Sequence, residues 1–249
     1  MAWSSSSSTP QEKHDVFLSF RGEDTRYTFT GHLHATLTRL QVKTYIDYNL
    51  LRGDEISSSL LKAIEEAKLS VVVFSKNYGN SKWCLDELVK ILECKRTRGQ
   101  IVLPIFYDID PSHVRNQTGT YAEAFVKHGQ VDRAQKWREA LREAANLSGW
   151  DCSVDRMESE LIEKIAKDVL EKLNRVYVGD LDQQIAKYEQ LAQLQHQFFQ
   201  SIPSHENWKS HQATVQRVTE LKMERSVRML RMSPDMLSHL GQSDNYNYF

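Results

Sequence analysis

Short apolar runs alternate along the chain with longer segments in which apolar residues recur at helical spacing. The runs have the length of β-strands and fall at residues 15–20, 42–47, 69–74 and 101–107. The periodic segments predict helices at residues 29–40 and 55–68 and from residue 81 onward. Strands that alternate with helices predict an α/β fold with a parallel sheet. The unbroken apolar run at 101–107 indicates a strand buried on both faces.

The segment after the fourth run predicts the remainder of this domain. Polar side chains dominate residues 108–119, which predicts a long loop. Residues 121–128 and 131–147 predict two helical pieces, and residues 148–152 are short enough to form an edge strand. Residues 157–173 predict a strongly periodic helix. The edge strand would be the fifth in the sheet.

The character of the sequence changes after Asn174. Apolar residues between Leu181 and Phe198 follow helical spacing, Pro203 interrupts the pattern, and a second helix is predicted beyond it. This extension holds no cluster of residues suited to catalysis, so we expect it to tune assembly. The predicted parts are a disordered Ser-rich leader at residues 1–12, the main domain at 13–174, the helical extension at 175–241 and a disordered tail at 242–249.

Composition narrows the class of protein. The chain has 249 residues, 40% of them hydrophobic and 26% charged, which is ordinary for a soluble globular protein. Its net charge of −1 gives no general attraction to nucleic acid or to an anionic membrane. The 3 cysteines match no zinc-binding spacing, and an odd number suits a reducing compartment. No apolar run approaches a membrane span and the leader lacks a signal-peptide core, so we expect the cytosol or the nucleus.

One stretch at the start of the third helix carries candidate chemistry. Ser81 is a plausible N-cap, and Leu85 and Leu88 place one face of this helix in the core. Trp83 and Glu87 lie one turn apart on a shared face. An aromatic ring beside a carboxylate can stack a substrate ring and bind a ribose hydroxyl. The alternative is a buried tryptophan and an exposed glutamate on an ordinary amphipathic helix.

Three polar segments converge on the carboxyl edge of the predicted sheet, where ligands bind in doubly wound folds. They are the turn at residues 21–26, the loop at 48–54 and the start of the third helix. The turn could bind pyrophosphate or ribose oxygens through its backbone N–H groups and its arginines. Its acidic residues favour ribose contact, and helix capping by Asp24 or Thr25 is the alternative.

Two other classes with this fold lack their defining residues here. A dinucleotide-binding dehydrogenase needs Gly-x-Gly-x-x-Gly after the first strand, and residues 21–26 do not supply it. A receiver domain needs a phosphoacceptor aspartate after the third strand, where this chain has Ser75. The chain also contains no P-loop sequence, which excludes that type of ATPase module.

Five segments in order resemble the signature boxes of plant TIR (Toll/interleukin-1 receptor) domains. They are residues 15–26, 52–56, 83–88, 103–107 and 110–115. The resemblance covers about residues 15–174. It implies a flavodoxin-like five-stranded parallel sheet flanked by helices (the TIR fold). The C-terminal helical extension that follows this fold resembles no named family. The resemblance also implies immune signalling by a TIR-only or truncated TIR protein.

The resemblance implies an NAD+ nucleosidase that releases nicotinamide and ADP-ribose-type signalling products, with Glu87 at the position of the family's catalytic glutamate. A carboxylate near the ribose can stabilise the positive charge that develops there. NAD+ or NADP+ is then the substrate, no cofactor or metal is needed, and the products act on lipase-like immune signalling proteins. The expected substrate-binding residues are Phe20, Arg21, Gly22, Glu23, Asp24, Thr25, Arg26, Leu51, Arg52, Gly53, Trp83 and Cys84.

The resemblance also implies self-association and binding to other TIR domains. Plant TIR domains pair through their first helix, often at a Ser-His pair, and this chain has Gly31 and His32 there. A second interface of the family maps to Gly149. The same surfaces would serve a non-catalytic adaptor that binds other TIR domains, which is the alternative function.

Overall fold

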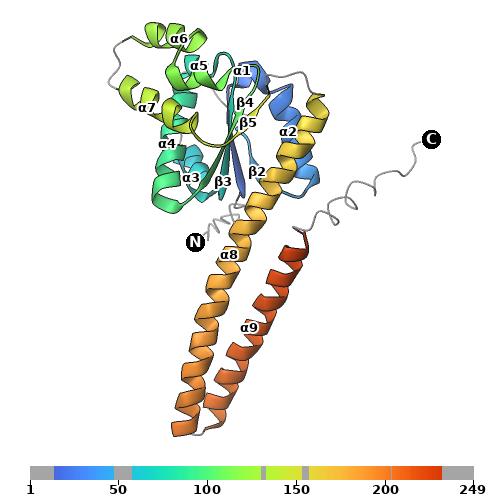
Figure 1. The fold of residues 1–249 in the computed structure, drawn as a ribbon. Coiled ribbons are helices and arrows are strands. Elements are labelled where there is room, and N and C mark those ends of the chain that lie inside the picture. Colours follow the sequence, from blue (N-terminus) through green and yellow to red (C-terminus); the bar gives the residue numbers. More distant parts are fainter. Residues whose placement is uncertain (1–13, 48–57, 130–132, 153–156, 203, 232–249) are drawn as a thin grey trace, which may run out of the picture. The chain divides into compact units, whose positions relative to one another are not determined.

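The computed structural model describes residues 14–47, 58–129, 133–152, 157–202 and 204–231, and the predicted leader and tail lie outside these ranges. A parallel five-stranded sheet with strand order β2-β1-β3-β4-β5 forms its centre (Figure 1). The strands are β1 (Val16–Phe20), β2 (Thr44–Tyr45), β3 (Leu69–Phe74), β4 (Ile101–Phe106) and β5 (Trp150–Asp151). The predicted α/β fold is confirmed.

The three long strands are the apolar runs that the sequence marks. All residues of β1 and β3 are buried, and the two strands pair in register from Val16 opposite Leu69 to Phe20 opposite Val73. The edge strands β2 and β5 are shorter than the runs predicted at 42–47 and 148–152. An edge strand pairs on one side only, so fewer of its residues join the ladder.

The described residues also form α-helices. They are α1 (Gly22–Thr25), α2 (Phe29–Arg39), α3 (Ser58–Glu66), α4 (Lys82–Arg98), α5 (Pro111–Asn116), α6 (Thr120–His128), α7 (Ala134–Ala144), α8 (Glu158–Ser201) and α9 (His205–Arg231), with a 3₁₀ turn η1 (Tyr78–Asn80). Helices α3, α4 and α7 cover one face of the sheet, and α2 and the first turns of α8 cover the other (Figure 1).

Two segments that were predicted as a turn and a loop each contain a short helix. The turn at 21–26 includes α1, and the polar loop at 108–119 includes α5. The Asp110 carboxylate caps α5 by accepting a hydrogen bond from the Ser112 N–H, and Pro111 occupies the first turn. Val114 on this helix is fully buried. Val114 is the one aliphatic residue of α5, so this helix has no apolar period in the sequence.

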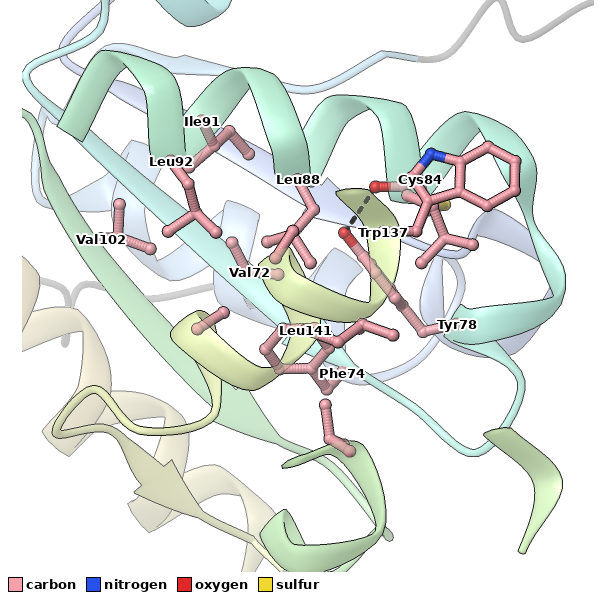
Figure 2. Packing of buried hydrophobic residues seen from close by; sticks show 14 of the residues in the cluster. Val72, Phe74, Tyr78, Cys84, Leu88, Ile91, Leu92, Val102, Trp137 and Leu141 are labelled. Carbon is pink, nitrogen blue, oxygen red and sulfur yellow. Dashed lines mark hydrogen bonds between the residues drawn. The ribbon is translucent and has the colours of Figure 1, made fainter. Parts of the chain in front are cut away.

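A large apolar cluster lies between the sheet and the layer of α3, α4 and α7 (Figure 2). Trp137 of α7 and Phe74 of β3 are fully buried in it, together with Leu88 of α4. Phe17 of β1 belongs to the same cluster. Because side chains alternate along a strand, Ser19 faces the same side of the sheet as Phe17.

The chain divides into two compact units, of which the first ends at Val169 and the second begins at Leu170. Helix α8 runs without a break through residue 174, where the sequence suggested a boundary. In the second unit, Leu181 and Ile185 of α8 and Leu221 of α9 form a small buried cluster, so these helices pack as a hairpin. Among the described residues, no helix has the length and hydropathy needed to cross a membrane.

Candidate active site

The first turn of α4 positions the candidate residues. Ser81 precedes the helix with an extended backbone, and its hydroxyl accepts a hydrogen bond from the N–H of Cys84 at 3.2 Å. This confirms the predicted N-cap, which satisfies an N–H group that no helical carbonyl can reach. The cap sets the start of the helix, and the start determines which side chains face the sheet.

Glu87 faces the sheet and not the solvent. Its side chain is only 4% exposed, and Oε2 lies within hydrogen-bond distance of the Ser19 hydroxyl, at 2.8 Å. Ser19 lies on β1 and is fully buried. The alternative of an exposed glutamate on an ordinary amphipathic helix is therefore wrong.

Burial makes Glu87 an unusually weak acid. Removal from water penalises the carboxylate and raises the pKa of Glu87 from 4.5 to about 8. The Ser19 hydrogen bond and the Trp83 indole lower this pKa, and the negative charge of Asp47 raises it further. The buried Nε1 of Trp83 nevertheless meets no acceptor with hydrogen-bond geometry among the described residues. At neutral pH, Glu87 in this setting is mainly a neutral acid.

Tyr78 and Cys84 lie on the buried side of the site, next to Ser19. The Tyr78 hydroxyl donates to the backbone carbonyl of Cys84 at 2.9 Å, as Figure 2 shows, and it lies 3.0 Å from Oγ of Ser19. The Cys84 thiol is buried and donates to the Phe20 carbonyl at 3.5 Å. Burial raises the pKa of both Tyr78 and Cys84, so neither side chain ionises near neutral pH.

The arginines of the segment at 21–26 already have partners. Arg21 pairs with Glu23 and with Asp24. The Arg26 guanidinium donates to the carbonyl of Asp47 at 2.8 Å and lies 5.3 Å from the centre of the Phe20 ring. A substrate that binds either arginine must share it with these partners.

Asp24 ties this segment to the end of β3. Its Oδ2 accepts hydrogen bonds from the Ser75 hydroxyl at 2.5 Å and from the Asn77 N–H at 3.2 Å. Thr25 is buried, and its hydroxyl accepts from Thr30 at 2.8 Å. Neither side chain caps α1, for which no side-chain cap bond is made. Asp24 thus joins the segment after β1 to the end of β3, as expected for the shared edge, whereas Thr25 joins that segment to α2.

The predicted site residues within the described ranges divide into three groups by exposure. Phe20, Thr25, Cys84 and Glu87 are buried, and the Glu23 side chain is about half exposed. The partly buried group is Arg21, Gly22, Asp24, Arg26 and Trp83. Leu51, Arg52 and Gly53 lie outside the described residues. Contact of these residues with a substrate stays a prediction.

Two sets of contacts near Glu87 were not found from the sequence. Ser19 contacts both Glu87 and Tyr78, and the only signal for this was a serine inside a buried apolar run. Asp86, the neighbour of Glu87 on α4, accepts hydrogen bonds from Trp137 Nε1 at 2.8 Å and from Arg133 at 2.6 Å, because α7 covers that side of α4.

The two positions proposed for self-association have different surroundings. His32 is well exposed on α2, and its Nδ1 lies 3.3 Å from a Glu158 carboxylate oxygen. Gly149 lies so close to the backbone of Pro104 in β4 that an added Cβ would lie 2.2 Å from the Pro104 carbonyl oxygen. An added Cβ at Gly31 would lie 2.6 Å from the carbonyl oxygen of Arg26. Both glycines are thus required for packing within the chain.

Comparison with known proteins agrees with this architecture. Disease resistance protein RPV1 of Vitis rotundifolia is 54% identical over 184 residues, which is 71% of this chain and 13% of that protein. Disease resistance protein RUN1 of the same species is 53% identical over 165 residues, 64% of this chain and 12% of that protein. The chain therefore spans only a small part of the length of these relatives.

Among solved structures, the TIR domains of the activated Roq1 resistosome, which directly recognises the pathogen effector XopQ, match with 52% identity and a TM-score of 0.59. The match covers 62% of this chain and 98% of that chain. The family model for the TIR domain matches residues 13–188, which is most of the chain. This chain belongs to the TIR domain family.

Proposed function

We propose that this chain is an NAD+ nucleosidase of plant innate immunity. The observation that supports the proposal is the placement of Glu87, which is enclosed beside Ser19 and one turn from Trp83. An acidic group in a low-dielectric setting with a strongly shifted pKa is typical of a functional site. The similarity to disease resistance proteins supports the immune role.

The reaction fits a site with one carboxylate. The bond between the ribose carbon and the nicotinamide nitrogen breaks, and its electron pair neutralises the positive charge of that nitrogen. Nicotinamide therefore departs without a general acid. In its ionised form, which is the minor form at neutral pH, Glu87 stabilises the positive charge that develops on the ribose. Water then adds to the ribose carbon and releases a proton, which yields ADP-ribose or a related product that acts on lipase-like signalling proteins.

Because Glu87 is enclosed, NAD cleavage in this proposal requires an opening of the site, which self-association would favour. A substrate must reach a carboxyl group that is 4% exposed, so the side chains above it must rearrange on binding. Self-association through surfaces near His32 and Gly149 would favour the open arrangement, because a partner that binds only this form shifts the population toward it. NAD cleavage in this proposal therefore depends on protein concentration.

The direct test is release of nicotinamide from NAD+ by the purified full chain at high concentration. We expect activity in the wild type and a loss of about 100-fold or more in Glu87→Gln, because the charge that stabilises the transition state is absent. Glu93→Gln is the matched control, since Glu93 lies on the same helix and its side chain is 53% exposed. Full turnover by folded Glu87→Gln would contradict the assignment.

A non-catalytic adaptor is the second candidate, and the small exposed fraction of Glu87 favours it. In that case the chain would bind other TIR domains and the enclosed carboxyl would serve only the fold. The same assay separates the two functions, because an adaptor releases no nicotinamide at any protein concentration at which it self-associates.

A further inference from the structure

A series of three short contacts leads from Glu87 to a backbone carbonyl through two buried hydroxyl groups. Glu87 Oε2 lies 2.8 Å from Ser19 Oγ, Ser19 Oγ lies 3.0 Å from the Tyr78 oxygen, and that oxygen lies 2.9 Å from the Cys84 carbonyl oxygen. Both Ser19 and Tyr78 are fully buried. The hydrogens that these protein groups can supply to the series can be counted.

The number of hydrogens decides the ionisation state that fits these distances. Each contact needs one hydrogen, the two hydroxyl groups supply one each, and the carbonyl of Cys84 supplies none. With Glu87 ionised, Ser19 donates to Glu87 and Tyr78 donates to Cys84. The Ser19 and Tyr78 oxygens would then face each other at 3.0 Å with no hydrogen between them. A neutral Glu87 supplies the missing hydrogen.

We propose that Ser19 and Tyr78 are positioning residues that hold Glu87 as a neutral acid in the resting protein and reorient when it ionises. In the neutral state Glu87 donates to Ser19, Ser19 donates to Tyr78, and Tyr78 donates to the Cys84 carbonyl. On ionisation the proton leaves Glu87 for solvent, and the Ser19 hydroxyl turns from Tyr78 to the carboxylate. One backbone carbonyl thus anchors both arrangements.

The other groups near Glu87 add no positive charge to oppose the neutral state. Tyr45 of β2 is an acid that is neutral at ordinary pH, and Asp47 just beyond that strand is an acid whose negative charge disfavours ionisation of Glu87. Cys84 on the same helix stays a thiol because burial raises its pKa. Arg26 directs a guanidinium N–H to the Asp47 backbone. Among the described residues, no cationic side chain donates to Glu87.

The two positioning residues should move the titration of Glu87 in opposite directions. Ser19→Ala removes the donor that the carboxylate needs, and a hydrogen bond to a charged group is stronger than one to a neutral group. The ionised state therefore loses more, and the pKa of Glu87 rises. Tyr78→Phe removes the acceptor of the Ser19 hydrogen in the neutral state only. Ser19 can then satisfy its hydroxyl only by donating to a carboxylate, so the pKa of Glu87 falls.

The catalytic consequence rests on the proposed function, in which the carboxylate is the active form. NAD+ cleavage should then rise with pH as Glu87 loses its proton. The rise should occur at higher pH in Ser19→Ala and at lower pH in Tyr78→Phe. A merely structural role for either residue would lower activity at every pH and would leave the midpoint in place.

The test is a direct titration of Glu87 in the full chain without substrate, by infrared difference spectra of the carboxylic acid against Glu87→Gln. We expect a midpoint at about pH 8 in the wild type. It should lie about one pH unit higher in Ser19→Ala and about one unit lower in Tyr78→Phe, the shift that the net free energy of one hydrogen bond produces. Ser19→Cys keeps a weak donor and should fall between wild type and Ser19→Ala.

Two matched controls remove a buried hydroxyl elsewhere. Ser70→Ala breaks a contact with Gln100, and Tyr121→Phe breaks one with the Ser75 carbonyl, so neither should move the midpoint of Glu87. Opposite shifts in the two test variants support the proposal whether or not the protein releases nicotinamide. Shifts in the same direction, or a wild-type Glu87 that is fully ionised at pH 7, would overturn it even in an active nucleosidase.

Discussion

The indole N–H of Trp137 donates to a carboxylate oxygen of Asp86 at 2.8 Å and so joins α7 to α4. Trp137 is fully buried, and Arg133 donates to the other carboxylate oxygen of Asp86. Asp86 and Glu87 are neighbours in sequence, but a helix turns them to different sides. Asp86 stabilises the helical layer, whereas Glu87 faces the sheet and belongs to the candidate site.

Replacing Asp86 should therefore reduce stability without affecting the titration of Glu87. In Asp86→Ala the Trp137 N–H loses its acceptor, and an unsatisfied buried donor costs about 1–3 kcal/mol. The measurement is the free energy of unfolding in urea. Glu93→Ala on the same helix is the control, with an expected change within about 0.5 kcal/mol. Equal stabilities of the two variants would show that the Trp137 contact contributes nothing.

Glu87 should make stability depend on pH. Its pKa is raised from 4.5 to about 8 in the folded state, so between these values the folded protein keeps a proton that the unfolded chain releases. The free energy of unfolding therefore falls as pH rises from about 4.5 to about 8 and is lowest above this range. A shift of this size corresponds to roughly 3–5 kcal/mol at alkaline pH.

Glu87→Gln, which cannot ionise, isolates this effect. The variant should match the wild type near pH 4.5 and exceed its stability at pH 9, as measured by urea unfolding at both values. Its loss of NAD cleavage would then accompany a gain in alkaline stability, the trade expected of a residue kept for function. A constant difference between wild type and variant across this range would mean that Glu87 titrates normally.

The sequence predicted the elements of the site better than their contacts. The apolar run at 69–74 coincides with β3, and Ser81 caps α4 as expected, because strand burial and helix capping are local. The contact between Glu87 and Ser19 joins residues that are distant in sequence. Helical spacing placed Glu87 beside Trp83 but gave no sign that β1 covers it.

Specific activity should increase with protein concentration. If self-association favours the open site, the rate of NAD cleavage per chain rises through the concentration range in which the oligomer forms. The measurement is nicotinamide release over a dilution series, with oligomer size followed by light scattering. His32→Ala should move the rise to higher concentration because His32 is exposed on the proposed surface. A rate per chain that stays flat would indicate a self-sufficient monomer.

Gly149 should be required for folding stability as well as for any interface. In Gly149→Ala the new Cβ would meet the Pro104 carbonyl oxygen at 2.2 Å, so the backbone next to β5 must shift. We expect a loss of about 2 kcal/mol or more in the free energy of unfolding. An assembly defect in this variant can be assigned to the interface only after its stability has been measured.

Gly179 on α8 should tolerate a side chain, in contrast to Gly149. An added Cβ there meets nothing within 4 Å, and alanine favours a helix over glycine by roughly 0.5–1 kcal/mol. Gly179→Ala should therefore stabilise the protein while Gly149→Ala destabilises it, as urea unfolding of both would show. A neutral Gly149→Ala would mean that the chain near Pro104 yields easily, and Gly149 would then be free for a role in assembly.

The hairpin of α8 and α9 should control assembly and not the chemistry of Glu87. Leu194 and Phe198 of α8 are each more than half exposed, although they continue the apolar stripe whose earlier members Leu181 and Ile185 are buried. An exposed apolar stripe on a helix indicates a partner surface.

A chain that ends at residue 174, just beyond the Val169 boundary of the first unit, tests this directly. It should keep its fold and the titration of Glu87, but change its size distribution in sedimentation. The full chain with Leu194→Glu and Phe198→Glu should show the same change in size, because these side chains contribute exposed surface and little to the hairpin core. Leu181→Glu is the matched control, since a charge at this buried position should unfold the hairpin. If the shortened chain were unfolded, the core that supports Glu87 would extend into the hairpin.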